Sequence, residues 1–349
     1  MYKSLKELAL NISEEEYRND GCIHYSMLSD YAKKGFDCID KLQEKKESPS
    51  LLFGSAVDTL LTEGKKAYDD MFFVCDLPNL TDSLYPIANQ LFDNYSSSYD
   101  SLDKISDETL ANIGKENNFY ANDKYRNYRV KLIREGCAAY YSMRFLAKNK
   151  QIVSSEFNES VQDTVKALKE SEATHWYFEE DNPFDDVERC YQLKFRSVFD
   201  NVPYTCKADL IIVDHRNKRI HPCDLKTSSH KEYDFFKSFI EWNYHIQARL
   251  YNKIITDNVL KDDAFCDYRI MPFKFIVVNK ETLSPLVWEY ADTEAEGTLY
   301  YGKYGNIECR HPLELGRELW TYIKGDYKVP VGIDTKQTNE LTLWLRTMK

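Results

Sequence analysis

Three β-type segments followed by one long helical pattern constrain the fold of this chain more than any other feature. The β-type segments are apolar and rich in β-branched residues, and short polar turns join them over residues 190–228: CYQLKFRSVFDN, YTCKADLIIVDH and KRIHPCDLKTS. The run that follows, residues 235–255, repeats apolar residues every three to four positions and predicts one continuous amphipathic helix. We therefore expect neighbouring strands of a sheet with a helix packed against them.

The remaining sequence predicts a mixed α/β fold, with a central mixed sheet flanked by helices. No repeat, low-complexity tract or long Pro/Gly linker divides the 349 residues, so a single domain is expected. Its expected parts are N-terminal helices over 24–76, a polar helical insert over 82–175, the sheet and its helix over 186–290, and a C-terminal helix and tail over 291–349. Within these parts, 269–280 and 283–290 are expected to form a hairpin and Leu313–Lys324 a helix.

The composition excludes several classes of protein. The formal net charge of −11 argues against a protein that coats nucleic acid by bulk electrostatics, although a local basic channel remains compatible with it. No apolar run approaches the roughly 20 residues of a membrane helix, and the charged N-terminus lacks a signal peptide. We expect a cytoplasmic protein without membrane association. Its nine cysteines should be reduced, and because none are spaced C-x-x-C, no iron–sulfur cluster is expected.

Two aspartates and a lysine form the candidate chemical centre. Asp209 precedes the apolar run LIIV, and Asp224-Leu225-Lys226 lies on the next β-type segment after a polar turn. Adjacent antiparallel strands can place Asp209 and Asp224 side by side, and alternation places Asp224 and Lys226 on the same face. Carboxylates suit Mg²⁺, which activates water and neutralises charge on a phosphate, while a lysine can orient or deprotonate that water. The grouping therefore suits phosphodiester hydrolysis.

This pattern resembles the D…(D/E)-x-K signature of the PD-(D/E)XK nucleases, whose core is restriction-endonuclease-like. Gln247-Ala248-Arg249-Leu250-Tyr251 is similar to the Q-x-x-x-Y motif of the RecB-like and exonuclease VIII branch, a type of phage recombination enzyme. The segment LLFGSAVDTLLTEG is similar to the G-x-x-x-H helix of that branch, with Asp58 where the family has histidine. The resemblance covers residues 24–76 and 186–290.

The resemblance implies roles for individual residues. Asp58, Asp209, Asp224 and the backbone carbonyl of Leu225 would bind Mg²⁺, with Mn²⁺ as an alternative, and aspartate in place of histidine leaves the metal preference open. Lys226 would be catalytic together with both strand aspartates, supported by Gln247 and Tyr251. A further acidic residue is expected on the preceding strand, where Glu188 and Gln192 are the candidates.

The activity implied is 5′–3′ exonuclease resection of duplex DNA ends, in the host cytoplasm if the chain is phage-encoded. The implied partners are DNA, a single-strand annealing protein and further copies of the chain. A structure-specific endonuclease of the same fold and an inactive nuclease-fold scaffold are the alternatives. On the structural alternative, D…DLK is a surface turn beside a solvated lysine, Gln247 a helix-face residue and Tyr251 a core aromatic.

Residues 120–150 mix basic and aromatic side chains in an otherwise acidic protein. They could hold phosphates and stack a frayed base, or form a solvated amphipathic helix with a tyrosine core face. The candidate DNA-binding residues are Arg126, Arg129, Lys131, Arg134 and Arg144 in this segment, and Arg249 in the Q-x-x-x-Y helix.

Overall fold

The computed structural model describes residues 2–42, 48–182, 186–290, 298–300 and 306–324. The chain divides into two compact units, each with its own packing. Unit 1 comprises Met1–Thr62 and Asp163–Lys349, and unit 2 comprises Glu63–Gln162. No described helix is both long enough and apolar enough to cross a membrane.

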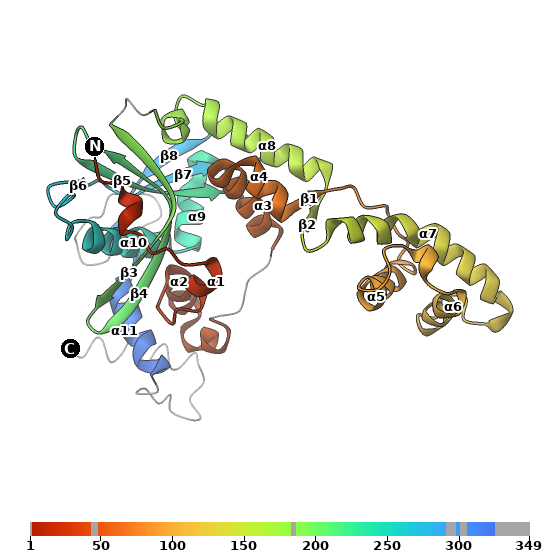
Figure 1. The fold of residues 1–349 in the computed structure, drawn as a ribbon. Helices are drawn as coiled ribbons and strands as arrows, with labels where there is room; N and C mark the ends of the chain where they lie inside the picture. The colour runs from red at the N-terminus through yellow and green to blue at the C-terminus, as the bar shows by residue number, and fades with distance from the viewer. Residues whose placement is uncertain (1, 43–47, 183–185, 291–297, 301–305, 325–349) are drawn as a thin grey trace. The chain divides into compact units, whose positions relative to one another are not determined.

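Unit 1 is built on a six-stranded mixed sheet (Figure 1). Its strands are β3 (Val187–Phe199), β4 (Val202–Asp214), β5 (Arg219–Thr227), β6 (Arg269–Ile270), β7 (Lys274–Val278) and β8 (Leu286–Glu289). Their order is β3-β4-β5-β7-β8, with β6 pairing the start of β5. The β3–β4, β4–β5 and β7–β8 pairs are antiparallel, whereas β5 pairs β6 and β7 in parallel. The predicted mixed α/β fold, its three strands over 190–228 and the hairpin after residue 269 are confirmed.

Helices flank this sheet. They are α1 (Glu14–Arg18), α2 (Tyr25–Lys34), α3 (Pro49–Asp58), α8 (Ser155–Glu170, shared with unit 2), α9 (Phe235–Glu241), α10 (Tyr244–Val259) and α11 (Pro312–Ile323). Short 3-10 turns are η1 (Leu5–Leu8), η2 (Gly35–Lys41), η6 (His175–Phe178) and η7 (Glu232–Asp234), and the π-turn η3 (Thr59–Glu63) follows α3. A small hairpin is formed by β9 (Thr298–Tyr300) and β10 (Asn306–Glu308). The helix expected near Leu313–Lys324 is α11; the tail beyond residue 324 lies outside the described residues.

The main core lies where α10 packs on β3 and β4 and is covered by α2 and α11. Ile246, Leu250 and Ile254 of α10 are fully buried there. The prediction of one continuous helix over 235–255 was wrong: α9 ends at Glu241, and Asn243 adopts a left-handed backbone conformation (φ +53°) that breaks the run before α10 begins. The break turns the chain so that Tyr244 and Gln247 can face the sheet.

Unit 2 is mainly helical, as expected for most of 82–175. It contains α4 (Gly64–Met71), β1 (Phe72–Val74), α5 (Tyr85–Tyr95), η4 (Leu102–Lys104), α6 (Asp107–Glu116), η5 (Asp123–Tyr125), α7 (Arg126–Ala147) and β2 (Gln151–Val153). Strands β1 and β2 pair in parallel, and α5, α6 and α7 enclose a core that includes Leu91, Ile133 and Tyr141. The single-domain interpretation of the sequence stays a prediction.

Candidate active site

Strands β4 and β5 separate at the point where Asp209 and Asp224 lie. Their antiparallel pairing runs as far as Leu210 opposite Cys223, so Asp209 and Asp224 occupy the next opposed positions. Beyond this point β5 continues alongside β7, while β4 stays paired with β3. Asp209 Oδ2 accepts the backbone N–H of Leu225 at 3.0 Å, which places the Asp209 carboxylate in the fork between the strands.

Asp224 contacts the two other predicted site residues. Its Oδ2 lies 2.5 Å from Lys226 Nζ, and its Oδ1 accepts a hydrogen bond from Gln247 Nε2 at 2.5 Å. Asp224 is only 2% exposed and Gln247 4%, so a lone carboxylate here would be costly and both contacts offset that cost. The predicted convergence of Asp224, Lys226 and Gln247 is therefore present in the structure.

Tyr244 confines the Lys226 side chain from the start of α10. The Lys226 ammonium lies 4.5 Å from the centroid of the Tyr244 ring. The Tyr244 ring is itself held in place, because it stacks on the rings of Phe235 and Phe275. Phe275 is the partner of Asp224 in the β5–β7 register. The lysine is thus held between a carboxylate and an aromatic ring, both fixed by packing.

Asp58 is engaged by Gln192 of β3. Gln192 Nε2 donates to both carboxylate oxygens of Asp58, at 2.9 and 2.8 Å. Gln192 and Asp209 lie between the paired positions Tyr191–Leu210 and Leu193–Ala208 of β3 and β4, and Gln192 has a left-handed backbone (φ +57°) inside the strand. Non-glycine residues rarely adopt this conformation, and when they do the strain often marks a functional position.

A close approach of α3 to β5 positions Asp58. Gly54, one helical turn before Asp58, would bring an added Cβ to 3.0 Å from Thr227 Oγ1 of β5. Glycine therefore lets the helix lie near the strand that carries Asp224 and Lys226. The G-x-x-x-D spacing found in the sequence corresponds to this contact.

The electrostatics of the site are those of crowded carboxylates. Burial raises the pKa of Asp209 well above its usual range, and the nearby charges of Asp224 and Asp58 raise it further. Burial alone would lower the pKa of Lys226, but the charge of Asp224 outweighs it and holds that pKa above its usual value. Lys226 is therefore protonated at neutral pH, and negative charge remains in excess around it.

The donor set fits a hard divalent cation, since Asp58, Asp209 and Asp224 offer only oxygen and repel one another. The side-chain oxygen of Gln192 is also buried and has no hydrogen-bond partner within the described ranges. In the part of the chain that the structure describes, no group of three or more His, Cys, Asp or Glu side chains is arranged to hold a metal. Instead, the carboxylate of Asp58 accepts a hydrogen bond from Gln192, and the carboxylate of Asp224 forms an ion pair with Lys226.

The other residues of the Q-x-x-x-Y helix are buried. Tyr251 is 7% exposed, and burial raises the pKa of its hydroxyl, with smaller contributions from charges that include Asp224 and Asp209. Arg249 is also buried, at 8% exposure. One turn earlier, burial lowers the pKa of His245 to about 3, so its ring is neutral. Tyr251 thus lies within electrostatic range of the acids, and the DNA-binding role of Arg249 stays a prediction.

The basic candidates of α7 divide into anchored and exposed residues. Arg129 is 2% exposed and donates to the carbonyl of Tyr120; Arg134 Nη2 contacts Asp107 at 2.6 Å and the carbonyl of Ile105 at 2.8 Å. Arg144 Nη1 donates to Asn89 at 2.7 Å. Arg126 and Lys131 are exposed, and the ammonium of Lys131 lies 3.8 Å from Glu135. Three of the five arginine and lysine candidates here have packing roles within unit 2.

Two site residues escaped a definite role in the sequence. The sequence assigns no role to Tyr244, although it lies three residues before Gln247 and hence on nearly the same helical face. Gln192 was one of two candidates for an acidic position. The other, Glu188, lies elsewhere, where its carboxylate accepts the backbone N–H of Leu5 at 3.1 Å.

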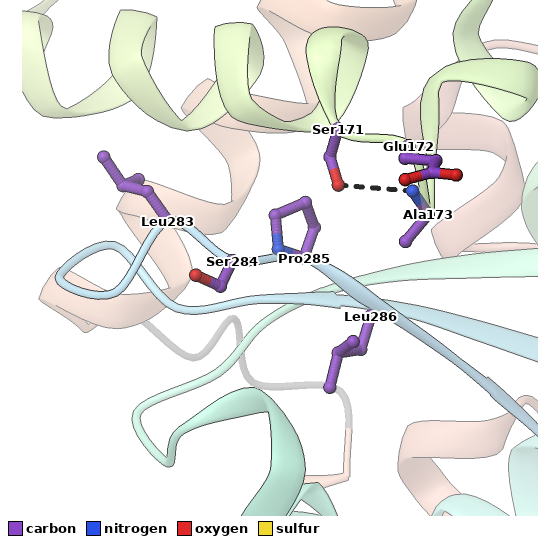
Figure 2. Close-up of a pocket in the computed structure, with 7 residues that line it drawn as sticks. All are labelled: Ser171, Glu172, Ala173, Leu283, Ser284, Pro285 and Leu286. Atoms are coloured by element: carbon purple, nitrogen blue, oxygen red, sulfur yellow. Dashed lines mark hydrogen bonds between the residues drawn. The ribbon is translucent and has the colours of Figure 1, made fainter.

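Unit 1 also has an open pocket whose lining includes none of the site residues described above. It is formed by the turn after α8 and by the loop leading into β8 (Figure 2). The lining residues are Ser171, Glu172, Ala173, Leu283, Ser284, Pro285 and Leu286. None of them is a candidate catalytic or metal-binding residue, so the pocket adds nothing to the site.

Comparison with known proteins gives little beyond this geometry. No protein-family model matches the chain, and no curated protein matches its sequence. A solved structure from Eubacterium rectale, described as that of a proposed exonuclease, is similar over 91% of this chain and 89% of its own, with 13% sequence identity and a TM-score of 0.43. At so low an identity and TM-score, function has to be inferred from the site residues themselves.

Proposed function

We propose that this chain is a metal-dependent deoxyribonuclease of the PD-(D/E)XK superfamily, acting as a 5′–3′ exonuclease on duplex DNA ends. The observation that carries the proposal is the contact of Lys226 Nζ with Asp224 Oδ2 at 2.5 Å, in the fork where Asp209 is the opposed residue. Asp224 is buried, and Asp209 and Lys226 are half-buried, at the point where the β4–β5 pairing ends. Apolar side chains would be cheaper to enclose there, so the charged set favours a functional role.

Asp209, Asp224, Asp58 and the carbonyl of Leu225 would hold Mg²⁺, or alternatively Mn²⁺. When bound, the cation would lower the pKa of water and offset charge on the phosphate. The carboxylate of Asp58 is held by Gln192 and that of Asp224 by Lys226 and Gln247, so each is kept near the fork in a fixed orientation. The mutual repulsion of the acids favours the arrival of positive charge.

Lys226 would supply positive charge to the reacting phosphate and orient the attacking water. Its contact with Asp224 Oδ2 keeps the ammonium beside the carboxylates that would hold the metal. Tyr244 limits where the ammonium can go, and Gln247 keeps Asp224 in reach of it. Tyr251 would support the same face of α10.

DNA would be held in part by the exposed cations Arg126 and Lys131 of unit 2. The family resemblance further implies self-association, which would favour processive resection, and transfer of the resulting single strand to an annealing protein. Both belong to the proposal.

A second function, an inactive nuclease-fold scaffold, is favoured by one observation. The carboxylate of Asp58 already accepts hydrogen bonds from Gln192, and that of Asp224 accepts one from Gln247 and forms an ion pair with Lys226. Such a set of contacts would also stabilise a fold that no longer binds metal.

The experiment is digestion of end-labelled linear duplex DNA beside a covalently closed circle, with Mg²⁺ and in separate reactions with Mn²⁺. Loss of the linear substrate alone, stopped by chelator, supports the exonuclease, and the label released first gives the polarity. Cleavage of the circle would instead indicate an endonuclease. If both substrates survive with either metal, the scaffold is the better description.

A further inference from the structure

Three exposed tyrosines form a cluster where α6 connects to α7 in unit 2. The rings of Tyr120, Tyr125 and Tyr128, here called the tyrosine cluster, are 44%, 41% and 50% exposed. Tyr120 lies edge-on to both others, with ring centroids 6.0 Å from Tyr125 and 5.2 Å from Tyr128. Within unit 2 the cluster lies at the end of α7 opposite the β1–β2 pair (Figure 1). The other two tyrosines of this basic–aromatic segment, Tyr140 and Tyr141, are buried in the core, as the amphipathic-helix alternative predicts.

The cluster is held in place by a buried arginine. Tyr120 has a left-handed backbone (φ +46°), and its carbonyl accepts a hydrogen bond from the guanidinium of Arg129, which is 2% exposed. Gly114 makes room for that side chain, because a Cβ there would lie 2.6 Å from Arg129 Cδ. On the inner side, the ring of Phe119 contacts that of Tyr120 at 5.0 Å. Buried groups thus fix a strained residue so that its ring points outward, an arrangement that stability alone does not require.

The surroundings of the cluster are positively charged. Residues 115–131 contain five Lys or Arg and two Asp or Glu, a net charge of +3 in a chain of −11. One of the two acids, Asp123, is paired with Lys115 at 3.0 Å. Lys124 Nζ lies 4.7 Å from the Tyr125 ring centroid and Arg126 is exposed. The N-terminus of α7, which begins at Arg126, adds positive potential. An anionic partner fits this surface.

We propose that the tyrosine cluster binds unpaired nucleotides of a DNA single strand, with bases stacked on the rings and phosphates near Lys124 and Arg126. Aromatic rings beside cations are how proteins hold single strands without reading sequence. In a duplex the base faces are covered by their neighbours, so the rings would have nothing to stack on. A protein partner is less favoured, because edge-to-face rings among exposed Asn122, Lys124 and Arg126 offer no continuous apolar area.

This proposal rests on the proposed nuclease function for the origin of the single strand, because resection of one strand at a duplex end would expose the other. Binding itself needs neither metal nor hydrolysis. The two proposals can therefore fail separately.

The test is binding of the full-length protein to a labelled single-stranded oligonucleotide and to its duplex, in chelator so that no hydrolysis occurs. The variants are Tyr120→Ala/Tyr128→Ala, the same pair changed to Phe, and Tyr85→Ala as a control on another tyrosine of unit 2 that is 54% exposed. We expect the alanine pair to weaken single-strand binding by roughly tenfold or more, and the phenylalanine pair and the control to bind as wild type does. Circular dichroism checks that each variant is folded.

Charge and hydrolysis give two further comparisons. Lys124→Gln/Arg126→Gln should reduce the dependence of single-strand affinity on salt by about two counterions. Lys261→Ala, which removes an exposed lysine of unit 1, should bind the single strand as wild type does. Because binding is measured in chelator, a failed nuclease would leave this proposal standing. Unchanged single-strand affinity in the alanine pair would overturn it, and so would an equal loss of duplex and single-strand binding, because base stacking predicts a selective loss.

Discussion

Gln192 donates from its amide nitrogen to both carboxylate oxygens of Asp58, at 2.9 and 2.8 Å, across 134 residues of sequence. The neutral amide of Gln192 therefore holds the Asp58 carboxylate, whose negative charge repels that of Asp209. The amide can hold Asp58 without a cation, and it does so from a backbone conformation that a strand residue seldom adopts.

The first prediction concerns this contact. Gln192→Glu replaces the donor with a second carboxylate, so the metal-free protein should lose stability and Mg²⁺ should raise its Tm more than it raises that of wild type. Thermal unfolding in chelator and in Mg²⁺ measures both effects. Gln151→Glu, on an exposed strand position of unit 2, is the matched control. If Mg²⁺ raises the Tm of wild type and of Gln192→Glu by the same amount, Gln192 does not lie at a metal site.

The second prediction concerns the approach of α3 to β5. Gly54→Val adds a branched side chain where even a Cβ would lie 3.0 Å from Thr227 Oγ1, so we expect α3 and Asp58 to move. Displacements of this size cost catalysis far more than folding, and we expect DNA hydrolysis to fall by about tenfold to a hundredfold. Ser55→Val, exposed on the neighbouring helical position, should retain wild-type rates. Equal rates in the two variants would contradict a role for α3 in the site.

The third prediction concerns pH and stability. Burial and neighbouring acids raise the pKa of Asp209, so the folded protein holds that proton more tightly than the unfolded chain does. This contribution is complete below the ordinary pKa of aspartate and is lost as pH rises towards the raised value. Without metal, Asp209→Asn should therefore be more stable than wild type at neutral pH, and the gain should vanish in acid.

Urea unfolding at a series of pH values, in chelator, measures this difference. Asp263→Asn, at an exposed position, is the control and should show no such gain. The same Asp209→Asn protein should lose Mg²⁺-dependent hydrolysis, because a carboxylate ligand is gone. A stability at neutral pH below that of wild type would mean that the Asp209 charge is favourable in the fold.

Much of this architecture could be read from local sequence pattern. The strands over 190–228 follow from apolar, β-branched runs joined by polar turns, and antiparallel pairing then places Asp209 opposite Asp224. The Lys226 contact follows from period-two alternation, and Gln247 from the helix that comes next. Each of these depends on neighbours close in sequence, where backbone geometry leaves few alternatives.

The remainder depends on long-range packing or on unusual backbone conformations. On β3 the core side chains are Cys190 and then Leu193, so the alternation shifts at Gln192, where the backbone is left-handed. Nothing in the local sequence signals that shift. The break at Asn243 is likewise a single left-handed residue within a continuous apolar pattern. The basic segment could not be divided into anchored and exposed parts, because Arg129 and Arg134 differ from Arg126 only in their tertiary partners.

The most direct test of the proposed centre compares two lysine variants on end-labelled linear duplex DNA with Mg²⁺. Lys226→Ala removes the ammonium beside Asp224, whereas Lys261→Ala removes one from an exposed pair with Asp257. We predict that wild type and Lys261→Ala digest the substrate, and that Lys226→Ala, folded by circular dichroism, is slower by on the order of 10²–10³-fold. Digestion by Lys226→Ala at the wild-type rate, or none by any of the three proteins in Mg²⁺ or Mn²⁺, would contradict it.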